Sequence, residues 1–130
     1  MRKKKRITNA VLQKREKRKA KRELKEAWQR VRQECLERDN YECQICRHKF
    51  DKTKPGGTAV HHIIPRQYKE LFLDIDNLIT LCSRCHHWNK ESPHQNALWF
   101  AEWLRKNKPE QYSHLHGLLE KEYPGEEEKI

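Results

Sequence analysis

Apolar residues are scarce in this chain. Of its 130 residues, 35% are hydrophobic, counting Ala and Cys, whereas 37% are charged. No apolar run approaches the roughly 20 residues that cross a bilayer, and the basic N-terminus lacks the apolar stretch of a secretory signal. We therefore expect no membrane contact and a cytoplasmic location. A core this small usually needs a metal or disulfides to hold it, so we expect one small stapled domain with extensions.

Acidic residues are nearly missing from the N-terminal quarter. Residues 1–32 hold 15 Lys or Arg and 3 Asp or Glu, a net charge of +12, while the rest hold 14 and 16, a net charge of −2. This asymmetry predicts a polyanionic partner. We expect residues 1–22 to form a solvated basic arm that is helical when it lies on phosphate and makes largely non-specific contacts with DNA. Its candidate contact residues are Lys14, Arg15, Lys17 and Arg18.

Four of the five cysteines form two C-x2-C pairs, Cys43 with Cys46 and Cys82 with Cys85. Two intervening residues let both sulfurs of a pair reach one ion at about 2.3 Å, and two pairs complete a closed tetrahedral site, which is how structural zinc is held. This pattern fits metal ligation in a reducing compartment better than a disulfide framework. The 35 residues between the pairs exceed the usual zinc-ribbon spacing, which predicts an inserted element.

That inserted element carries a histidine pair. His61 and His62 lie on a predicted strand over residues 58–64, and a second pair, His86 and His87, directly follows the last cysteine at a helix predicted to begin near Ser83. Adjacent strand residues point to opposite faces. One strand histidine and one helix histidine can therefore share a divalent ion, while the other strand histidine stays free to act as a base. The pattern predicts an open metal site beside the closed one.

The sequence around these cysteine and histidine pairs resembles the HNH endonuclease motif over roughly residues 28–90. The similar segments are Arg38 to Cys43, His61 to Pro65, Asn77-Leu78, and Leu81 to His86. The resemblance implies an α+β fold with a ββα-metal (HNH) core, stapled by a four-cysteine zinc site and flanked by N- and C-terminal helices. It also implies a division into a basic arm (1–22), a nuclease core with its preceding helix (23–92) and a C-terminal helical extension (93–130).

The resemblance further implies roles for single residues in metal-dependent hydrolysis of DNA phosphodiesters. His62 would be the general base, His61 and His86 would hold the catalytic divalent ion, and Asn77 would orient the His62 ring. Many family members have Asp where His61 stands. This departure weakens the case for Mg²⁺, because imidazole suits Mn²⁺ or Ni²⁺ better. Mn²⁺, Ni²⁺ and Mg²⁺ are the candidates for the catalytic metal. Small members of this kind also suggest a phage enzyme that works with packaging proteins in the host cytoplasm.

The chemistry is plausible on physical grounds as well. A histidine with a pKa near 6.5 can act as a base at neutral pH, an effect typically worth ~10²–10⁴-fold. Arg66 and Arg84 are candidates for phosphate contacts, and Asn89 and His87 are lower-ranked metal ligands. Two other readings stay open. One is a non-catalytic zinc-ribbon-like module that binds nucleic acid through its arm, and the other is an RNA-directed role.

The flanking segments favour helices. Leu24, Trp28, Val31 and Cys35 follow helical spacing, which predicts an amphipathic helix that ends near Arg38, with Cys35 as a packing residue. Beyond the motif, Ser92-Pro93 resembles a helix start. Trp99 and Trp103, one helical turn apart, are expected to pack, and His114 and His116 to lie at the surface.

Overall fold

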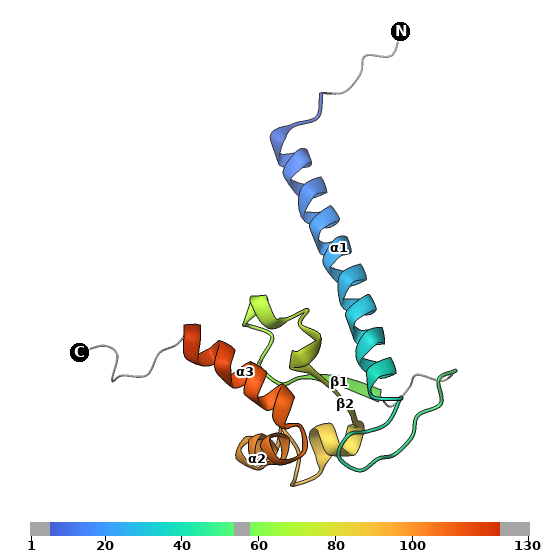
Figure 1. Cartoon of the computed structure of the whole chain (residues 1–130). Coiled ribbons are helices and arrows are strands. Elements are labelled where there is room, and N and C mark those ends of the chain that lie inside the picture. The colour runs from blue at the N-terminus through green and yellow to red at the C-terminus, as the bar shows by residue number, and fades with distance from the viewer. Residues whose placement is uncertain (1–5, 54–57, 123–130) are drawn as a thin grey trace, which may run out of the picture.

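The computed structural model describes residues 6–53 and 58–122. A long helix, α1 (Asn9–Arg38), leads into a two-stranded sheet of β1 (Thr58–His62) and β2 (Leu78–Cys82). Short helical turns η1 (Lys69–Leu71) and η2 (Ile75–Asn77) lie between the strands, and η3 (Arg84–Trp88), α2 (Ala97–Asn107) and α3 (Pro109–Glu122) follow them (Figure 1). The predicted α+β class is confirmed. The outermost parts of the predicted arm and C-terminal extension, residues 1–5 and 123–130, lie outside the described residues.

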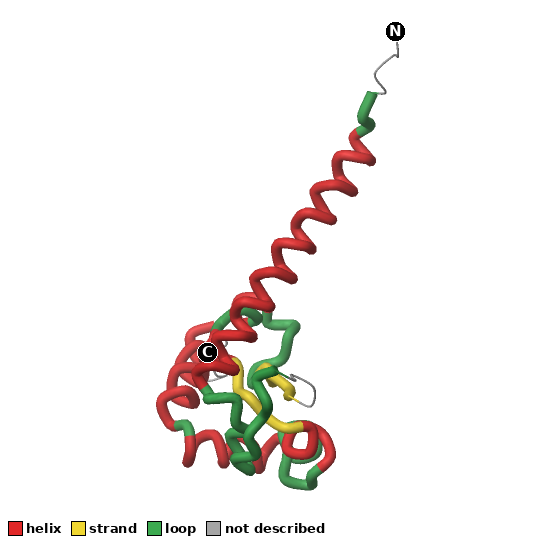
Figure 2. The backbone as a smooth tube through the Cα atoms, turned by 90° about the vertical axis from the view of Figure 1, so that its right-hand side faces the viewer, coloured by secondary structure: helices red, strands yellow, loops and turns green. Residues whose placement is uncertain are grey.

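Helix α1 ends at Arg38, as predicted, because Asn40 and Tyr41 take positive φ angles of 55° and 54° that no helix continues. Its start differs from the expectation. The helix already begins at Asn9, well before the amphipathic stretch from Leu24, and it is capped by the Thr8 hydroxyl, which accepts a hydrogen bond from the amide of Val11 at 3.3 Å. Lys, Arg, Ala and Glu are good helix formers, which favours this continuation. Figure 1 and Figure 2 both show α1 projecting away from the remaining elements.

The two strands are antiparallel, with His61 opposite Ile79 and His62 opposite Leu78. Strand β1 ends two residues before the predicted Ile64. There the Ile63 amide donates to the Asn77 carbonyl at 2.8 Å and the Ile64 amide donates to the Asn77 side chain at 2.7 Å. The regular pairing of β1 with β2 therefore ends where Asn77 binds the chain, and Asn77 is the residue that is expected to orient His62.

Strand β2 lies between two core clusters. The first contains Ile79 and Leu81 with the helix α2 residues Phe100 and Leu104, and Trp99 and Trp103 pack against it. The second contains Leu78. Its other buried members are Cys35, Leu36 and Val60. The packing roles predicted for Cys35 and for the two tryptophans are confirmed.

The predicted start of the C-terminal helix at Ser92-Pro93 is wrong. Helix α2 begins at Ala97, and Asn96 caps it by accepting from the Trp99 amide at 3.0 Å. Ser92 is buried, and its hydroxyl donates to the Asn89 carbonyl at 2.7 Å and accepts from the Gln95 amide at 3.2 Å. A hydroxyl used in this way closes a turn instead of capping a helix.

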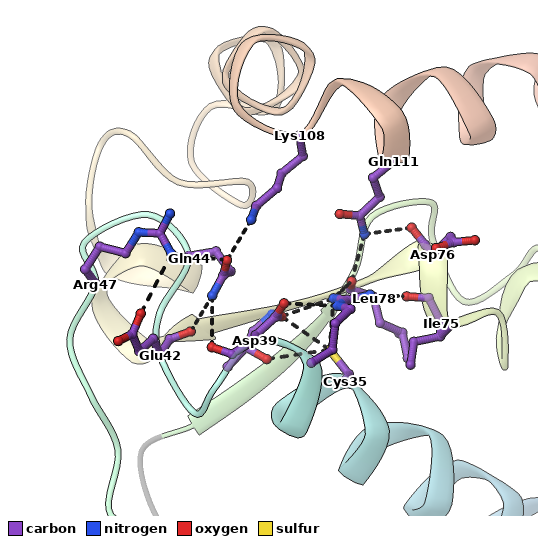
Figure 3. Close-up of polar contacts among 12 residues, drawn as sticks. Cys35, Asp39, Glu42, Gln44, Arg47, Ile75, Asp76, Leu78, Lys108 and Gln111 are labelled. Carbon is purple, nitrogen blue, oxygen red and sulfur yellow. Dashed lines mark hydrogen bonds and ion pairs between the residues drawn. The ribbon is translucent and has the colours of Figure 1, made fainter.

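A polar network fixes both long helices to the turn before β2 (Figure 3). Arg38 at the end of α1 donates to the carbonyl oxygens of Ile75 and Leu78 at 2.7 and 2.6 Å. Gln111 of α3 donates to the carbonyl oxygens of Asp76 and Leu78 at 2.7 and 2.8 Å. These carbonyls flank Asn77, so α1 and α3 together hold the turn that carries Asn77 in place. Among the described residues, no helix combines the length and apolarity needed to span a bilayer.

Candidate metal centres and active site

The four paired cysteines meet at one end of the sheet, where β2 ends at Cys82 opposite Thr58. The Sγ atoms of Cys43, Cys46, Cys82 and Cys85 all lie within 4.8 Å of one another, and those of Cys46 and Cys82 are 3.6 Å apart. Four ligands 2.3 Å from one ion in a tetrahedron would be separated by about 3.8 Å. The cluster therefore fits a structural zinc site in both ligand type and size.

Local backbone geometry builds this cluster. After Cys46 the chain turns through Arg47, whose φ is 65°, and the Arg47 amide donates to the Cys43 carbonyl at 2.8 Å. On the other pair, the Cys85 amide approaches the Cys82 sulfur at 3.5 Å. Burial and the neighbouring sulfur of Cys82 raise the pKa of Cys85, because a thiolate there would be desolvated and would face other thiolates. A bound cation would relieve this cost.

Three histidines converge beside the cysteine cluster. Nδ1 of His61 lies 3.0 Å from Nε2 of His86, and Nε2 of His94 lies 3.0 Å from the same His86 atom. One ring nitrogen can donate at most one hydrogen bond, so two contacts to one atom are not both satisfied by the neutral rings alone. Two nitrogens about 2.1 Å from one ion and at right angles are about 3.0 Å apart, which matches this spacing. The donor set fits a divalent transition-metal ion.

The protonation state of these rings also suits a metal. Burial, together with the neighbouring histidines, lowers the pKa of His61 to about 3 and that of His86 to about 4. Both rings are therefore neutral near pH 7, and the neutral imidazole is the form that donates a lone pair to a metal.

His94 was missed by the sequence reasoning. It lies eight residues after His86, in an irregular segment that Gln95 folds back by donating to the His87 carbonyl at 2.8 Å. No periodic spacing marks it. The available signal was a further histidine within ten residues of the last cysteine pair, in the turn that Pro93 begins.

The two lower-ranked ligand candidates lie elsewhere. The His87 ring stacks on that of His94 at 4.3 Å between centroids and is not one of the three converging donors. The Asn89 side chain approaches the Cys85 sulfur at 3.8 Å, on the zinc side. His86 is thus better placed than either for the open site.

His62 occupies the opposite face of β1 from His61, as the strand alternation predicts. Its ring stacks against Trp28 and against Phe72, each with a centroid separation of 4.8 Å, and these two rings lie 5.3 Å from each other, so the three form one aromatic cluster. Its Nε2 lies 3.0 Å from the Phe72 carbonyl oxygen. Because a carbonyl only accepts, Nε2 carries the proton and Nδ1 keeps the free lone pair. Burial lowers the pKa of His62, and the positive charge of Arg66 lowers it further.

Asn77 is fully buried and holds the two segments that frame His62. Its side-chain oxygen accepts from the Ile64 amide at 2.7 Å, and its nitrogen donates to the Ile64 and Leu71 carbonyls at 3.1 and 3.0 Å. Ile64 follows His62 by two residues, and Leu71 precedes Phe72, whose carbonyl binds the His62 ring. Asn77 therefore acts on His62 through the backbone on both sides of the ring.

The three converging histidines and His62 line one cavity of about 680 Å³. His61, His62, His86 and His94 line it on one side, together with Arg66. Apolar residues of α2 and α3 line the other side: Ala97, Phe100, Ala101, Leu104, Leu115 and Leu119. Strand alternation separates the two β1 rings, yet both reach the same space.

The predicted phosphate-contact residues and the two late histidines fall in three places. Arg84, at the start of η3, does not line the cavity, in contrast to Arg66. Lys14, Arg15, Lys17 and Arg18 are all exposed on the projecting part of α1. The two late histidines are exposed, as expected, and His114 pairs with Asp74 at 3.3 Å.

Residues 43–91 match the family model described as HNH endonuclease. The chain contains an HNH endonuclease domain. The HNH segment includes both cysteine pairs, the strand histidines and Asn77, and it ends three residues before His94. Comparisons with curated proteins and with solved structures give no match. The HNH domain supports a nuclease-type function, with metal binding and a nucleic-acid substrate.

Proposed function

We propose that this protein is a metal-dependent DNA endonuclease of the HNH type. The single observation that carries the proposal is the convergence of three neutral histidine nitrogens on one side of β1, with a separately held histidine on the other side, in one cavity. His61, His86 and His94 would hold the divalent ion. His62 would be the general base, and the four cysteines would hold structural zinc.

The surroundings of His62 support the role of a base. Its Nε2–H is committed to the Phe72 carbonyl, so Nδ1 is the atom that can accept a proton from a water molecule. Packing against the rings of Trp28 and Phe72 restrains its rotation. A pKa lowered by burial keeps the ring unprotonated at neutral pH. A base held in one tautomer and one orientation satisfies the geometric requirement for activating a water.

The other groups would handle the charge of the phosphodiester. Arg66 lines the cavity and can contact a non-bridging phosphate oxygen as a charged donor. A divalent ion, when bound by the three histidines, would stabilise the developing negative charge and the leaving 3′ oxygen. The apolar walls from α2 and α3 exclude water from that side of the cavity, which strengthens these electrostatic contacts.

Cleavage of supercoiled plasmid tests the proposal. Wild type and His62→Ala are compared with Mg²⁺, Mn²⁺, Ni²⁺ or EDTA. We expect metal-dependent nicking by the wild type and a rate lower by ~10²–10⁴-fold in His62→Ala, with equal zinc content and equal circular dichroism. DNA binding without cutting in any of the metals would contradict the nuclease assignment and favour a non-catalytic zinc-ribbon-like module. Preferential cutting of RNA would contradict DNA as the substrate.

The biological setting is also a proposal. We infer that the protein is a phage enzyme that acts on double-stranded DNA in the cytoplasm of the host cell, together with the phage packaging proteins. The resemblance to small phage HNH enzymes supports this setting.

A further inference from the structure

The projecting part of α1 has an uneven distribution of charge. Residues 9–26 are all exposed and contain eight Lys or Arg and three Glu. Helical geometry turns each residue by about 100° from the previous one. Counted from Trp28, five basic residues and no acidic residue fall within about 80° of its direction. These five, which we call the basic stripe, are Lys14, Lys17, Arg18, Lys21 and Lys25.

The other side of the same stretch is electrically balanced. The remaining three basic and three acidic residues all lie about 120° or more from Trp28. They are Arg15, Lys19, Arg22, Glu16, Glu23 and Glu26. One pair of opposite charge, Lys19 and Glu23, is 4.0 Å apart. In contrast, the five stripe residues form no ion pair with any residue that the structure describes, so their charge is available to a partner.

The stripe has a fixed direction relative to the candidate active site. Trp28 lies on the same face of α1 as the basic stripe, and its ring stacks on His62. The C-terminal end of α1 is anchored to the core at two residues. Arg38 donates to the Ile75 and Leu78 carbonyls. The carboxylate of Asp39 accepts from the Thr80 amide at 2.9 Å. With both contacts in place, the helix can neither swing nor rotate freely about its axis. The stripe therefore points along the same side of the molecule as the His62 ring.

A second helix is a poor occupant for this surface. The exposed apolar residues of the projecting stretch are Val11, Leu12 and Leu24. They point about 100°, 160° and 40° away from Trp28, in three different directions, so they form no continuous apolar seam of the kind that helix pairing needs. Charge complementarity instead favours a regular polyanion.

We propose that α1 is a one-sided ruler for duplex DNA, with its basic stripe lying along the phosphates on a single side of the scissile bond. The inference rests on the proposed nuclease function and adds the shape of the substrate. Lys14 and Trp28 are 14 residues apart, which corresponds to about 21 Å of helix and about six base pairs of DNA. The enzyme would therefore need roughly six base pairs of duplex on one side of the cut and would make no such contact on the other.

A matched pair of double variants tests which face binds. Lys17→Ala with Lys21→Ala removes two charges from the stripe, and Arg15→Ala with Lys19→Ala removes two from the balanced side of the same turns. Binding of a fluorescently labelled 30-base-pair duplex is followed by anisotropy across a salt titration. Each lost phosphate contact lowers the slope of log K against log salt by about 0.9. We expect a loss of about 1.8, and an affinity at least tenfold weaker at 0.1 M salt, for the stripe variant alone.

Insertions test the phase of the helix at constant charge. Two alanines between Arg22 and Glu23 turn the outer stripe by about 200°, whereas seven turn it by about 20° and move it outward by about 10 Å. The two-residue insertion should weaken binding as the stripe variant does. The seven-residue insertion should keep the salt slope but lengthen by about three base pairs the shortest duplex that gives full binding. Circular dichroism checks that both variants stay helical.

Equal losses in the two double variants, or an unchanged salt slope after the two-alanine insertion, would overturn the ruler, since charge alone would then account for binding. These measurements use binding and not cleavage. A protein that binds DNA with the expected phase dependence but never cuts it would contradict the proposed nuclease function and leave the ruler standing. A protein that cuts DNA without phase dependence would do the reverse.

Discussion

The two candidate metal centres of this protein are built from the same strand and the same helical turn, but one is closed and the other is open. In the closed site, four sulfurs surround a single point and two of them, on Cys43 and Cys85, are almost completely buried. In the open site, three imidazoles approach from one side and face a cavity. Strand β2 ends at Cys82, and η3 carries both Cys85 and His86. Zinc in the closed site would set the position of His86, a proposed ligand of the open site, without itself taking part in the proposed reaction.

This comparison predicts different consequences for the two ligand sets. Loss of a closed-site ligand should affect folding, because structural zinc contributes energy that a small core lacks. Loss of an open-site ligand should affect metal binding and activity, because the core clusters that hold α1, β1 and α2 contain none of the three histidines.

The largest effect is expected for Cys82→Ser. Removing one thiolate should lower zinc occupancy and remove a large part of the coupled folding energy, which is about 10–16 kcal/mol in small zinc domains. Zinc content by atomic absorption and helicity by circular dichroism measure the outcome. The variant should lose the helix signal of α2 and α3 near room temperature. A variant that stays folded without zinc would show that the four cysteines are not a structural site.

A smaller and more selective effect is expected for His94→Ala. Its ring is exposed, so its removal should leave the melting temperature and the zinc content unchanged. Affinity for Mn²⁺ or Ni²⁺, measured by calorimetry, should fall at least tenfold, because even residues that only support metal ligands contribute 10–100-fold. The matched control is His116→Ala, an exposed histidine that lines the same cavity outside the converging group. Equal metal affinity in the two variants would remove His94 from the ligand set.

The smallest functional effect is expected at the fifth cysteine. Burial raises the pKa of Cys35 to about 11, and its sulfur contacts the Thr80 hydroxyl at 3.5 Å. The raised pKa keeps the neutral thiol below about pH 11, so the reactive thiolate is rare from pH 7 to 9. Maleimide labelling followed by mass spectrometry should therefore find Cys35 unmodified in the native protein and modified in urea. Rapid native labelling would show that Cys35 is accessible and does not belong with the core.

Much of both centres could be predicted from the sequence because their residues lie in short, regular segments. Two residues between cysteines define a chelating pair wherever the pair occurs, and alternation along β1 separates His61 from His62 in any antiparallel sheet. The turn at residues 74–77 was likewise predictable, since the Asp74 side chain accepts from the Asp76 amide at 2.9 Å within three residues. These features depend on neighbours in the chain.

Three other features depended on elements that are distant in the sequence. His94 joins the open site only because the irregular segment before α2 folds back on η3. His62 is held in one orientation because α1 brings Trp28 against its ring, and in one tautomer because the chain after β1 brings the Phe72 carbonyl to its Nε2. The helical arm points along the His62 side only because Arg38 anchors α1 to carbonyls about 40 residues later in the chain.

The sequence by itself therefore determined which residues are chemically competent: the four thiols, the strand histidines, the buried amide and the basic arm. The tertiary structure decided which of them share a site, in which tautomer, and in which direction the arm points. The physical reason is that ligand spacing and strand alternation are local properties of the chain. The convergence of side chains from separate elements is set by packing against a common core, which no single segment specifies.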